Sequence, residues 1–542
     1  MLTWLTFGLI GVLLLAGVVA LLWRRFYRDD PANAARRVFK NSAVTLGLRL
    51  VVRGLDMVVF FLLAGTLNVA RFGDYTFAAL LVSQYLAIFT EFGLGVLLTR
   101  EVARDPTAAQ RLFGVTLALR LLLILVGALP LALLVLGSFV LVGQPLSAEG
   151  SAAILILMLT LVPGAYAGAV TALYHAHERM EVPAMLELVS AALSFLARIA
   201  VILLAPTILG LAWSAVAVST VTATIFFFLQ RRDFFAPTLA WDGAAMRATV
   251  PLALPLMLNN LLSAVFFRFD VFIVRAFTGD AAEGLVGQYN LTYTILGIAL
   301  IVPPAVTFAV FPLLARRADG DRAAFAAAQQ RTLQLLLIVA FPLAMGISLL
   351  AYDLVRFFTR SQFADYPHAV WALAILAWFL PLSFANGLLQ YALIALNQQR
   401  AITRAFLLGA GFNLLANFIA IPFASVLLGR ADWGLYAAAG ITILSELVLY
   451  LVFRPLLLRE GLPPKLLALS WRPALAALVM GLLMWSLQTL IGGWPGSLVA
   501  ALVSPLAYAV ALWALGGIGT GERKLVLKIL GRKNEGEGGA LP

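Results

Sequence analysis

The sequence predicts an all-α polytopic membrane protein, and three observations lead to this class. Of the 542 residues, 62% are hydrophobic and 12% are charged, which is about half of the charged fraction of an average soluble domain. Apolar stretches of about 20 residues, long enough to cross the hydrocarbon layer as a helix, recur along the whole chain. Basic residues gather in alternate connections between these stretches, as they do in membrane proteins with cytoplasmic loops.

The apolar stretches predict about fifteen transmembrane helices, at residues 2–23, 43–66, 75–98, 112–141, 152–175, 184–205, 208–230, 250–277, 286–314, 332–351, 370–396, 403–429, 433–453, 473–492 and 495–517. The connections between these helices fall into two alternating sets. The set that begins after the first helix holds 28 of the 38 basic residues, and the other set holds four. Cytoplasmic loops collect Lys and Arg. We therefore expect a multi-pass protein of the cell membrane with its N-terminus outside and its C-terminus in the cytoplasm.

The first helix is expected to stay in the protein as an anchor. Its charges, Arg24 and Arg25, follow the apolar stretch, whereas a cleaved signal peptide carries its positive charge before that stretch. The expected organisation is an anchor helix with a basic cytoplasmic linker, two transporter lobes, two C-terminal helices, and a basic tail that we expect to be disordered. In this order the parts cover residues 1–40, 41–240, 241–460, 461–520 and 521–542.

Composition argues against several other classes. The formal net charge is +12, but the basic residues are spread over many short loops and form no stripe that follows a phosphate backbone, so we expect no nucleic-acid partner. The chain has no cysteine, which excludes disulfides and cysteine-ligated metals. His175 and His177 lie only two residues apart and lack the further partners that a metal site needs. We expect neither a metal nor a cofactor.

Six arginines lie within stretches that are otherwise apolar enough to cross a membrane, namely Arg49, Arg53, Arg120, Arg198, Arg268 and Arg275. Each arginine near the centre of a membrane helix opposes insertion by roughly 2.5–3.5 kcal/mol. The six together oppose it by on the order of 15–20 kcal/mol, less what snorkelling and pairing recover. Arginines that face a hydrated cavity and meet a negative ligand explain this load best, which indicates a transporter of an anion.

A short internal repeat occurs at an offset of 214 residues. Phe72-Gly73-Asp74-Tyr75 matches Val286-Gly287-Gln288-Tyr289, and at the same offset Asp56 falls on Asp270. Each copy therefore has an intramembrane Asp on the helix before a Gly-X-Tyr helix start. Many secondary transporters consist of repeated halves around a central site. So short a match in apolar sequence also arises by chance, and both explanations stay open here.

Several short motifs give the chain a family resemblance. In order they are Lys40-Asn41-Ser42, Phe72-Gly73-Asp74-Tyr75, Glu91-Phe92-Gly93-Leu94-Gly95, Thr99-Arg100-Glu101, Arg268-Phe269-Asp270, Val286-Gly287-Gln288-Tyr289 and Phe311-Pro312. With this order and spacing, residues 38–460 resemble the polysaccharide-flippase (Wzx-type) branch of the multidrug/oligosaccharidyl-lipid/polysaccharide exporter superfamily. The additional first helix departs from the family pattern of twelve to fourteen helices.

The resemblance implies an architecture and a cargo. It implies two pseudo-equivalent six-helix lobes around a central, alternating-access cavity, followed by two C-terminal helices that often form a groove for a lipid tail. The implied cargo is an oligosaccharide on a polyprenyl pyrophosphate, moved from the cytoplasmic to the outer leaflet. The expected partners are this cargo, membrane lipids and proteins of polysaccharide assembly.

The arginines are the first candidates for binding the cargo. Arg49, Arg53 and Asp56 share one helix face, because they follow i, i+4, i+7 spacing. Guanidinium groups bind phosphate oxygens bidentately, so Arg53 and Arg268 are expected to hold the pyrophosphate, helped by the other four. The alternative for each is structural: Arg49 snorkels to the surface, Arg53 pairs with Asp56, and Arg275 reaches water near the outer end.

Two of the helping arginines carry further alternatives. Arg120 lies one to two turns inside its helix, and Arg198 lies deeper, with Glu187 eleven residues earlier on nearly the same face. A structural pair of Glu187 with Arg198 is as well supported by the sequence as contact with cargo.

Carboxylates and polar side chains complete the candidate site. Asp56, Asp270, Glu91 and Glu446 are expected to act in gating or to bind a coupling ion, H⁺ or Na⁺, and the alternative is pairing with arginines of other helices. Asn413, Asn417, Tyr75 and Tyr289 are candidates for sugar contacts, although helix packing and interfacial anchoring explain such residues equally well. No residue is expected to be catalytic.

The predicted function is a flippase for an anionic, lipid-linked oligosaccharide. One alternative is a multidrug cation exporter of the same superfamily, whose cavity should hold more acid than base. A second is a polyprenyl-dependent polymerase or ligase, which should have a long outer loop with catalytic groups. A third is a non-transporting scaffold for assembly partners. Excess arginine and short outer loops favour the flippase.

Overall fold

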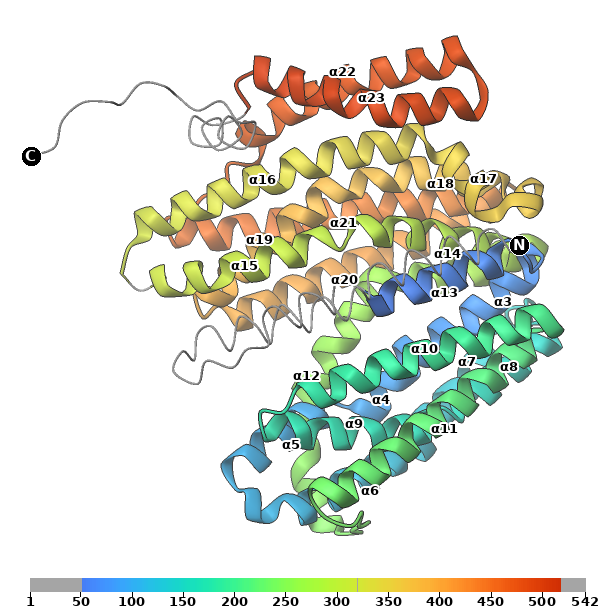
Figure 1. Ribbon diagram of the computed structural model, residues 1–542, viewed down its shortest axis with the longest axis vertical. Coiled ribbons are helices and arrows are strands. Elements are labelled where there is room, and N and C mark those ends of the chain that lie inside the picture. The colour runs from blue at the N-terminus through green and yellow to red at the C-terminus, as the bar shows by residue number, and fades with distance from the viewer. Residues whose placement is uncertain (1–50, 319, 518–542) are drawn as a thin grey trace, which may run out of the picture. The chain divides into compact units, whose positions relative to one another are not determined.

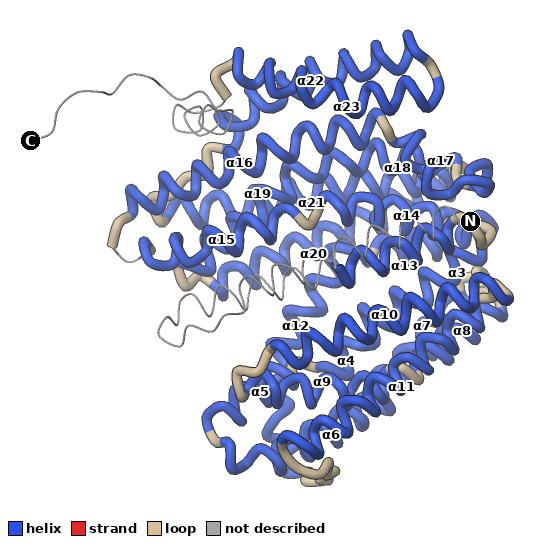
Figure 2. The backbone as a smooth tube through the Cα atoms, in the orientation of Figure 1, coloured by secondary structure: helices blue, strands red, loops and turns tan. Residues whose placement is uncertain are grey.

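The computed structural model describes residues 51–318 and 320–517. Within these ranges every regular element is helical, and Figure 2 shows these helices joined by loops and turns. The predicted anchor helix 2–23, the whole of the linker up to residue 40 and the predicted tail 521–542 lie outside the described residues. The all-α polytopic class that composition predicts is confirmed.

Thirteen helices in the described ranges are long and apolar enough to cross a membrane. They match thirteen of the fifteen predicted spans. Of the other two, 2–23 lies outside the description, and 43–66 is described from Val51, from which it is helical to residue 64. The spans are Val69–Arg104, Pro106–Leu141, Ala148–Ala176, Glu181–Leu204, Ile208–Asp233, Gly243–Arg268, Gly279–Thr307, Arg322–Leu349, Pro367–Ala395, Gln399–Leu427, Ala431–Arg459, Leu466–Ile491 and Gly493–Ala514.

The chain folds into two compact units that alternate along the sequence. The first comprises residues up to Thr294 with Val355–Ala369 and Ala410–Ala438, and the second comprises the intervening segments and the C-terminal part. The contiguous lobes 41–240 and 241–460 remain a prediction. In chain order (Figure 1) the helices up to residue 299 are α3 (Val69–Leu80), α4 (Ala87–Glu91), α5 (Leu94–Arg104), α6 (Ala109–Leu123), α7 (Leu129–Leu141), α8 (Ala148–Met158), α9 (Leu161–Ala176), α10 (Glu181–Leu204), α11 (Ile208–Asp233), α12 (Gly243–Arg268), α13 (Asp270–Phe277) and α14 (Ala282–Ala299).

The remaining helices are α15 (Val302–Arg317), α16 (Arg322–Leu349), α17 (Ala351–Thr359), α18 (Pro367–Leu376), α19 (Leu380–Ala395), α20 (Gln399–Pro422), α21 (Ala431–Arg459), α22 (Leu466–Ile491) and α23 (Gly493–Ala514). In the second unit α22 and α23 form a hairpin that lies along α16 (Figure 1). Met345 of α16 packs against Ala477, Met480 and Gly481 of α22. The hairpin is also tied to α16 by the Tyr508 hydroxyl, which donates to the Ile338 carbonyl at 2.7 Å.

The predicted helix 75–98 is broken, and the break positions part of the candidate site. Phe92 and Gly93 adopt left-handed backbone angles, with φ of 46° and 74°. A side chain at residue 93 would lie 2.5 Å from the Leu256 Cβ of α12, so glycine serves both the turn and the close approach. The Glu91 carboxylate then accepts from the Gly95 amide at 3.0 Å, which caps the new N-terminus of α5. The predicted span is therefore present as Val69–Arg104, but its helix is interrupted at Phe92 and Gly93.

Helices α3 and α14 touch through their glycines in the first unit. A Cβ on Gly73 would overlap the Glu283 carbonyl oxygen and lie 3.0 Å from the Gly287 amide nitrogen. A Cβ on Gly287 would lie 2.7 Å from the Val69 carbonyl oxygen. One turn further, the Asn290 amide donates to the Thr76 hydroxyl at 3.0 Å. Gly73 with Gly287 and Thr76 with Asn290 are each 214 residues apart, so equivalent positions of the sequence repeat lie against each other.

Candidate functional site

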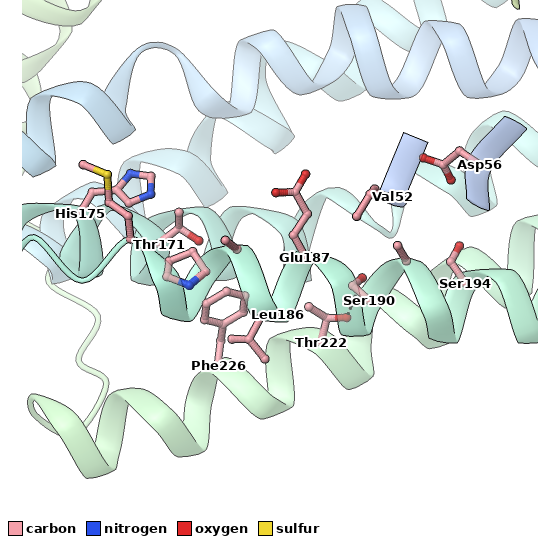
Figure 3. A pocket seen from close by; sticks show the side chains of 14 residues that line it. Val52, Asp56, Thr171, His175, Leu186, Glu187, Ser190, Ser194, Thr222 and Phe226 are labelled. Carbon is pink, nitrogen blue, oxygen red and sulfur yellow. Dashed lines mark hydrogen bonds between the residues drawn. The ribbon is translucent and has the colours of Figure 1, made fainter. Parts of the chain in front are cut away.

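A cavity of about 500 Å³ lies within the first unit, between the helical segment 51–64 and helices α9, α10 and α11. Figure 3 shows its polar side chains distributed along its length. They are Thr171, His175, Glu187, Ser190, Ser194, Thr222 and Asp56. Apolar groups such as Val52, Leu186 and Phe226 form the rest of the wall.

One face of α10 supplies much of the cavity wall. Glu187, Ser190, Ser194 and Arg198 are separated by three, four and four residues, a spacing that places side chains on one side of a helix. Ser190 and Ser194 follow Glu187 toward the end where Asp56 lies (Figure 3). The Ser190 hydroxyl accepts from Thr222 of α11 at 3.0 Å. Glu187 itself makes no hydrogen bond or ion pair with any residue of the described ranges.

Two predicted arginines lie at the Asp56 end of this cavity. Arg198 Nη1 is 3.6 Å from Asp56 Oδ1. Arg198 therefore pairs with Asp56, whereas the sequence spacing had suggested Glu187 as its structural partner. Arg53 is exposed and acts electrostatically on Asp56, one turn later on the same helix. Among the described residues no hydrogen bond or ion pair occupies the Arg53 guanidinium.

Arg268 is held by neutral groups. At the end of α12, its Nη2 donates to the Asn290 side-chain oxygen, and its guanidinium lies over the Tyr293 ring at 4.5 Å from the centroid. Neither partner carries a charge, and within the described part of the chain no carboxylate forms an ion pair with it, although the nearby Asp270 interacts with it electrostatically.

Arg120 and Arg275 are fixed by internal contacts. Arg120, 1% exposed, lies 2.6 Å from a Glu91 carboxylate oxygen and donates to the Ala165 carbonyl at 3.1 Å. Arg275, 3% exposed, donates at 3.3 Å both to Glu283 and to the Pro145 carbonyl. Both guanidinium groups serve the packing of the first unit, and we leave them out of the proposed cargo site.

The four predicted carboxylates have different surroundings. Asp56 lines the cavity, and Glu91 caps α5 and pairs with Arg120. Asp270, 1% exposed, accepts from the Tyr289 hydroxyl at 2.5 Å and from the Val271 amide at 2.9 Å.

Glu446 lies in the second unit and is 2% exposed. Its carboxylate accepts from the Asn386 amide at 2.7 Å and bonds with Ser383. No ion pair within the described ranges includes it. Burying a carboxylate without a cation is costly, so Glu446 is the carboxylate whose surroundings best suit a coupling ion.

The predicted sugar contacts are buried. Tyr75 is 7% exposed, Tyr289 is fully enclosed beside Asp270, and Asn417 donates to Asn413 one turn earlier on α20. These positions contribute to helix packing, and we do not carry them into the proposed site. Arg49 lies outside the described residues, so its expected role stays a prediction.

The cavity hydroxyls were missed by the sequence analysis. The available signal was the polar stripe Glu187, Ser190, Ser194 on an otherwise apolar helix. His175 had been considered only as a metal ligand, and the structure places it at one end of the cavity beside Thr171 (Figure 3). No group of three or more His, Cys, Asp or Glu among the residues described is arranged to hold a metal ion.

Three solved structures that share this fold are described as a flippase or as transporters. A lipid II flippase, MurJ, in an inward closed conformation superposes with a TM-score of 0.65 at 14% identity, covering 88% of this chain and 98% of its own. An inward-facing multidrug resistance MATE family transporter of the MOP superfamily gives 0.58 at 13% identity, covering 77% and 94%. A MOP superfamily transporter from Pyrococcus furiosus, described as having a binding pocket of reverse polarity, gives 0.53 at 14% identity, covering 79% and 95%. At these identities the likeness establishes the fold alone.

Sequence comparison gives the family. No curated protein matches the sequence significantly. The family described as "Polysaccharide biosynthesis protein" matches residues 38–317, just over half of the chain. Together with the helical fold shared with flippases and exporters of the MOP superfamily, this match shows that the chain is a polytopic membrane protein of the polysaccharide biosynthesis protein family.

Proposed function

We propose that the protein is a flippase that moves an anionic polyprenyl-pyrophosphate-linked oligosaccharide from the cytoplasmic to the outer leaflet. The observation that carries the proposal is the state of two intramembrane arginines. Arg53 is exposed without a hydrogen bond or ion pair among the described residues, and Arg268 is held by a neutral amide and an aromatic ring. Neither guanidinium forms an ion pair within the described ranges, although Asp56 acts electrostatically on Arg53 and Asp270 on Arg268. Each guanidinium can therefore bind a pyrophosphate oxygen pair bidentately.

Alternating access would use the contact between α3 and α14. By the distribution of basic loops, Gly73 and Gly287 lie toward the outer ends of their helices. Their close approach would then close the outer side in this conformation, and their separation would open it. Repeated halves that rock about a fixed site are the general design of such carriers.

Energy for transport would come through Glu446. Its buried carboxylate has an amide and a hydroxyl as partners, and a bound proton or sodium ion would relieve the cost of its burial. A gradient of that ion would then drive the change of conformation.

A multidrug cation exporter is the second candidate, because two carboxylates, Asp56 and Glu187, line the cavity. The contact of Asp56 with Arg198 weakens this alternative, since the arginine already supplies a positive charge at that carboxylate. The two functions differ in the charge of the cargo, which makes them easy to separate in an assay.

The test is transport of a fluorescent polyprenyl-pyrophosphate sugar into proteoliposomes. We expect Arg53→Ala and Arg268→Ala each to lower the rate by at least tenfold, because a hydrogen bond to a charged group contributes about 1.5–3 kcal/mol. Arg430→Ala is the matched control, because Arg430 lies on an exposed loop and its side-chain contacts in the described ranges, an ion pair with Asp432 and the Trp433 ring, are local. Full activity in both site variants would remove the site, and no transport by the wild type would refute the function.

A further inference from the structure

The cavity beside Arg198 is suited to a ligand that carries both hydroxyl groups and apolar faces. Its volume of about 500 Å³ falls within the range of roughly 300–1,000 Å³ that small-molecule sites occupy. We propose that it is the subsite for the sugar next to the pyrophosphate, and that this sugar is uncharged. This inference rests on the flippase function proposed above and adds the class of sugar that the carrier accepts.

The cavity wall offers acceptors in the arrangement that a sugar ring needs. Glu187 lies in the middle with no partner among the described residues, and a carboxylate accepts hydrogen bonds through two oxygens. Hydroxyls of Ser190 and Ser194 continue along α10, and Thr171 lies toward the other end (Figure 3). A sugar ring presents hydroxyl donors along its rim, which these groups can receive.

The same cavity has an apolar side. The Phe226 ring of α11 and the side chain of Leu186 form part of the wall, and Val52 lies near the Asp56 end. The C–H groups on the faces of a pyranose pack against such surfaces. Sites for small molecules characteristically combine an apolar lining with a few converging polar groups.

The position of the charges explains why the sugar should be neutral and close to the pyrophosphate. Arg198 pairs with Asp56 at one end of the cavity and offsets the charge of that carboxylate. Arg53, which is assigned above to the pyrophosphate, lies one turn from Asp56 on the same helix, so a diphosphate bound to Arg53 would sit at this end. Glu187 lies further along the same face of α10, four residues before Ala191 and eleven before Arg198. An anionic sugar would place its carboxylate near that of Glu187, and two like charges a few ångströms apart repel.

The experiment measures binding to the purified full-length protein by titration calorimetry. The probes are short-chain polyprenyl pyrophosphates that carry no sugar, N-acetylglucosamine or glucuronic acid. For the wild type we expect the N-acetylglucosamine probe to bind about tenfold more tightly than the sugar-free probe, the equivalent of one hydrogen bond to a charged acceptor. We expect the glucuronic acid probe to gain nothing.

Glu187→Gln tests the role of the cavity directly. It should remove most of the advantage of N-acetylglucosamine, narrow the difference from glucuronic acid, and leave the sugar-free probe unchanged. Glu181→Gln is the matched control, because Glu181 is an exposed residue in the first turn of α10 that does not line the cavity. Ser194→Ala should reproduce part of the loss without changing a charge.

The possible failures are distinct. A wild type that binds the sugar-free probe without any gain from N-acetylglucosamine overturns the sugar subsite and leaves the flippase proposal standing. A wild type that binds none of the pyrophosphates overturns the flippase and the subsite together. If Glu187→Gln abolishes binding of tetraphenylphosphonium but keeps the sugar advantage, the cavity is a cation site and the inference is wrong.

Discussion

The contact between α3 and α14 gives the sharpest prediction. A methyl group at residue 73 would lie 2.8 Å from the Glu283 carbonyl carbon, about 1 Å inside the usual separation of 3.5–4.0 Å between carbon atoms. The obstructing atoms belong to the backbone, so the helices themselves must separate. Overpacking of this kind costs roughly 1–3 kcal/mol, which corresponds to a factor of about 5–150 in the population of the conformation described here.

The matched control lies on the partner helix. At Gly284, three residues before Gly287, a Cβ would meet only the Val69 side chain, at an ordinary 3.5 Å. Gly73→Ala and Gly284→Ala both gain the helix propensity of alanine, about 1 kcal/mol over glycine. Their difference therefore isolates the effect of helix separation.

The assay uses a pair of cysteines as a proximity reporter. The chain contains no cysteine, so Thr76→Cys with Asn290→Cys introduces the only thiols. The Thr76 hydroxyl and the Asn290 amide are 3.0 Å apart, and oxidation should cross-link the pair readily. In this background Gly73→Ala should slow cross-linking on the order of tenfold, whereas Gly284→Ala should not.

The transport rates of the two alanine variants should follow the same order as their cross-linking rates, because a carrier must visit both conformations. Gly73→Ala is expected to lower the transport rate. The cross-linked cysteine pair is expected to transport more slowly than the same variant after reduction, which is the reference because Asn290→Cys also removes a partner of Arg268. Equal cross-linking rates in the two alanine variants would refute the close contact. Slow cross-linking with full transport would refute its role as a gate.

Two further predictions concern the buried ionic groups. Gly168→Ala would place a methyl group 2.5 Å from Arg120 Nη1, and we expect a loss of roughly 1–3 kcal/mol of stability by thermal unfolding in detergent. Gly164→Ala, which meets open space on the same helix, should leave the melting temperature in place or raise it. Glu446→Gln should preserve cargo binding but abolish the stimulation of transport by a proton or sodium gradient; undiminished stimulation would remove Glu446 as the coupling site.

The fold was largely predictable because it follows from composition. A membrane helix needs about 20 apolar residues, and each of the thirteen described spans matches a predicted one. The break at Phe92 and Gly93 was not predicted, since hydropathy takes no account of backbone angles. The signal was present in Glu91-Phe92-Gly93-Leu94-Gly95, where one glycine provides the turn and the other makes room for the Glu91 carboxylate.

The site was less predictable, because partners across helices are invisible in a linear sequence. The spacing of Glu187 and Arg198 on one helix suggested a pair, yet Arg198 meets Asp56, more than 140 residues earlier. Glu91 and Arg120 likewise find each other only when their helices pack. The repeat was visible as an offset of 214, but only the structure shows Thr76 bonded to Asn290 at that offset.

The free-energy cost of placing arginines in the membrane is offset in two different ways. For Arg120 and Arg275 the cost is offset within the protein, because each contacts a carboxylate and a backbone carbonyl. Their removal should therefore appear chiefly as lost stability, since each substitution leaves a void where an enclosed side chain packed and removes the donor from a backbone carbonyl. Arg53 and Arg268 form no ion pair with a carboxylate in the described part of the chain. If the cargo supplies the missing negative charge, their removal should cost transport while leaving the melting temperature nearly unchanged, and this contrast separates a binding arginine from a structural one.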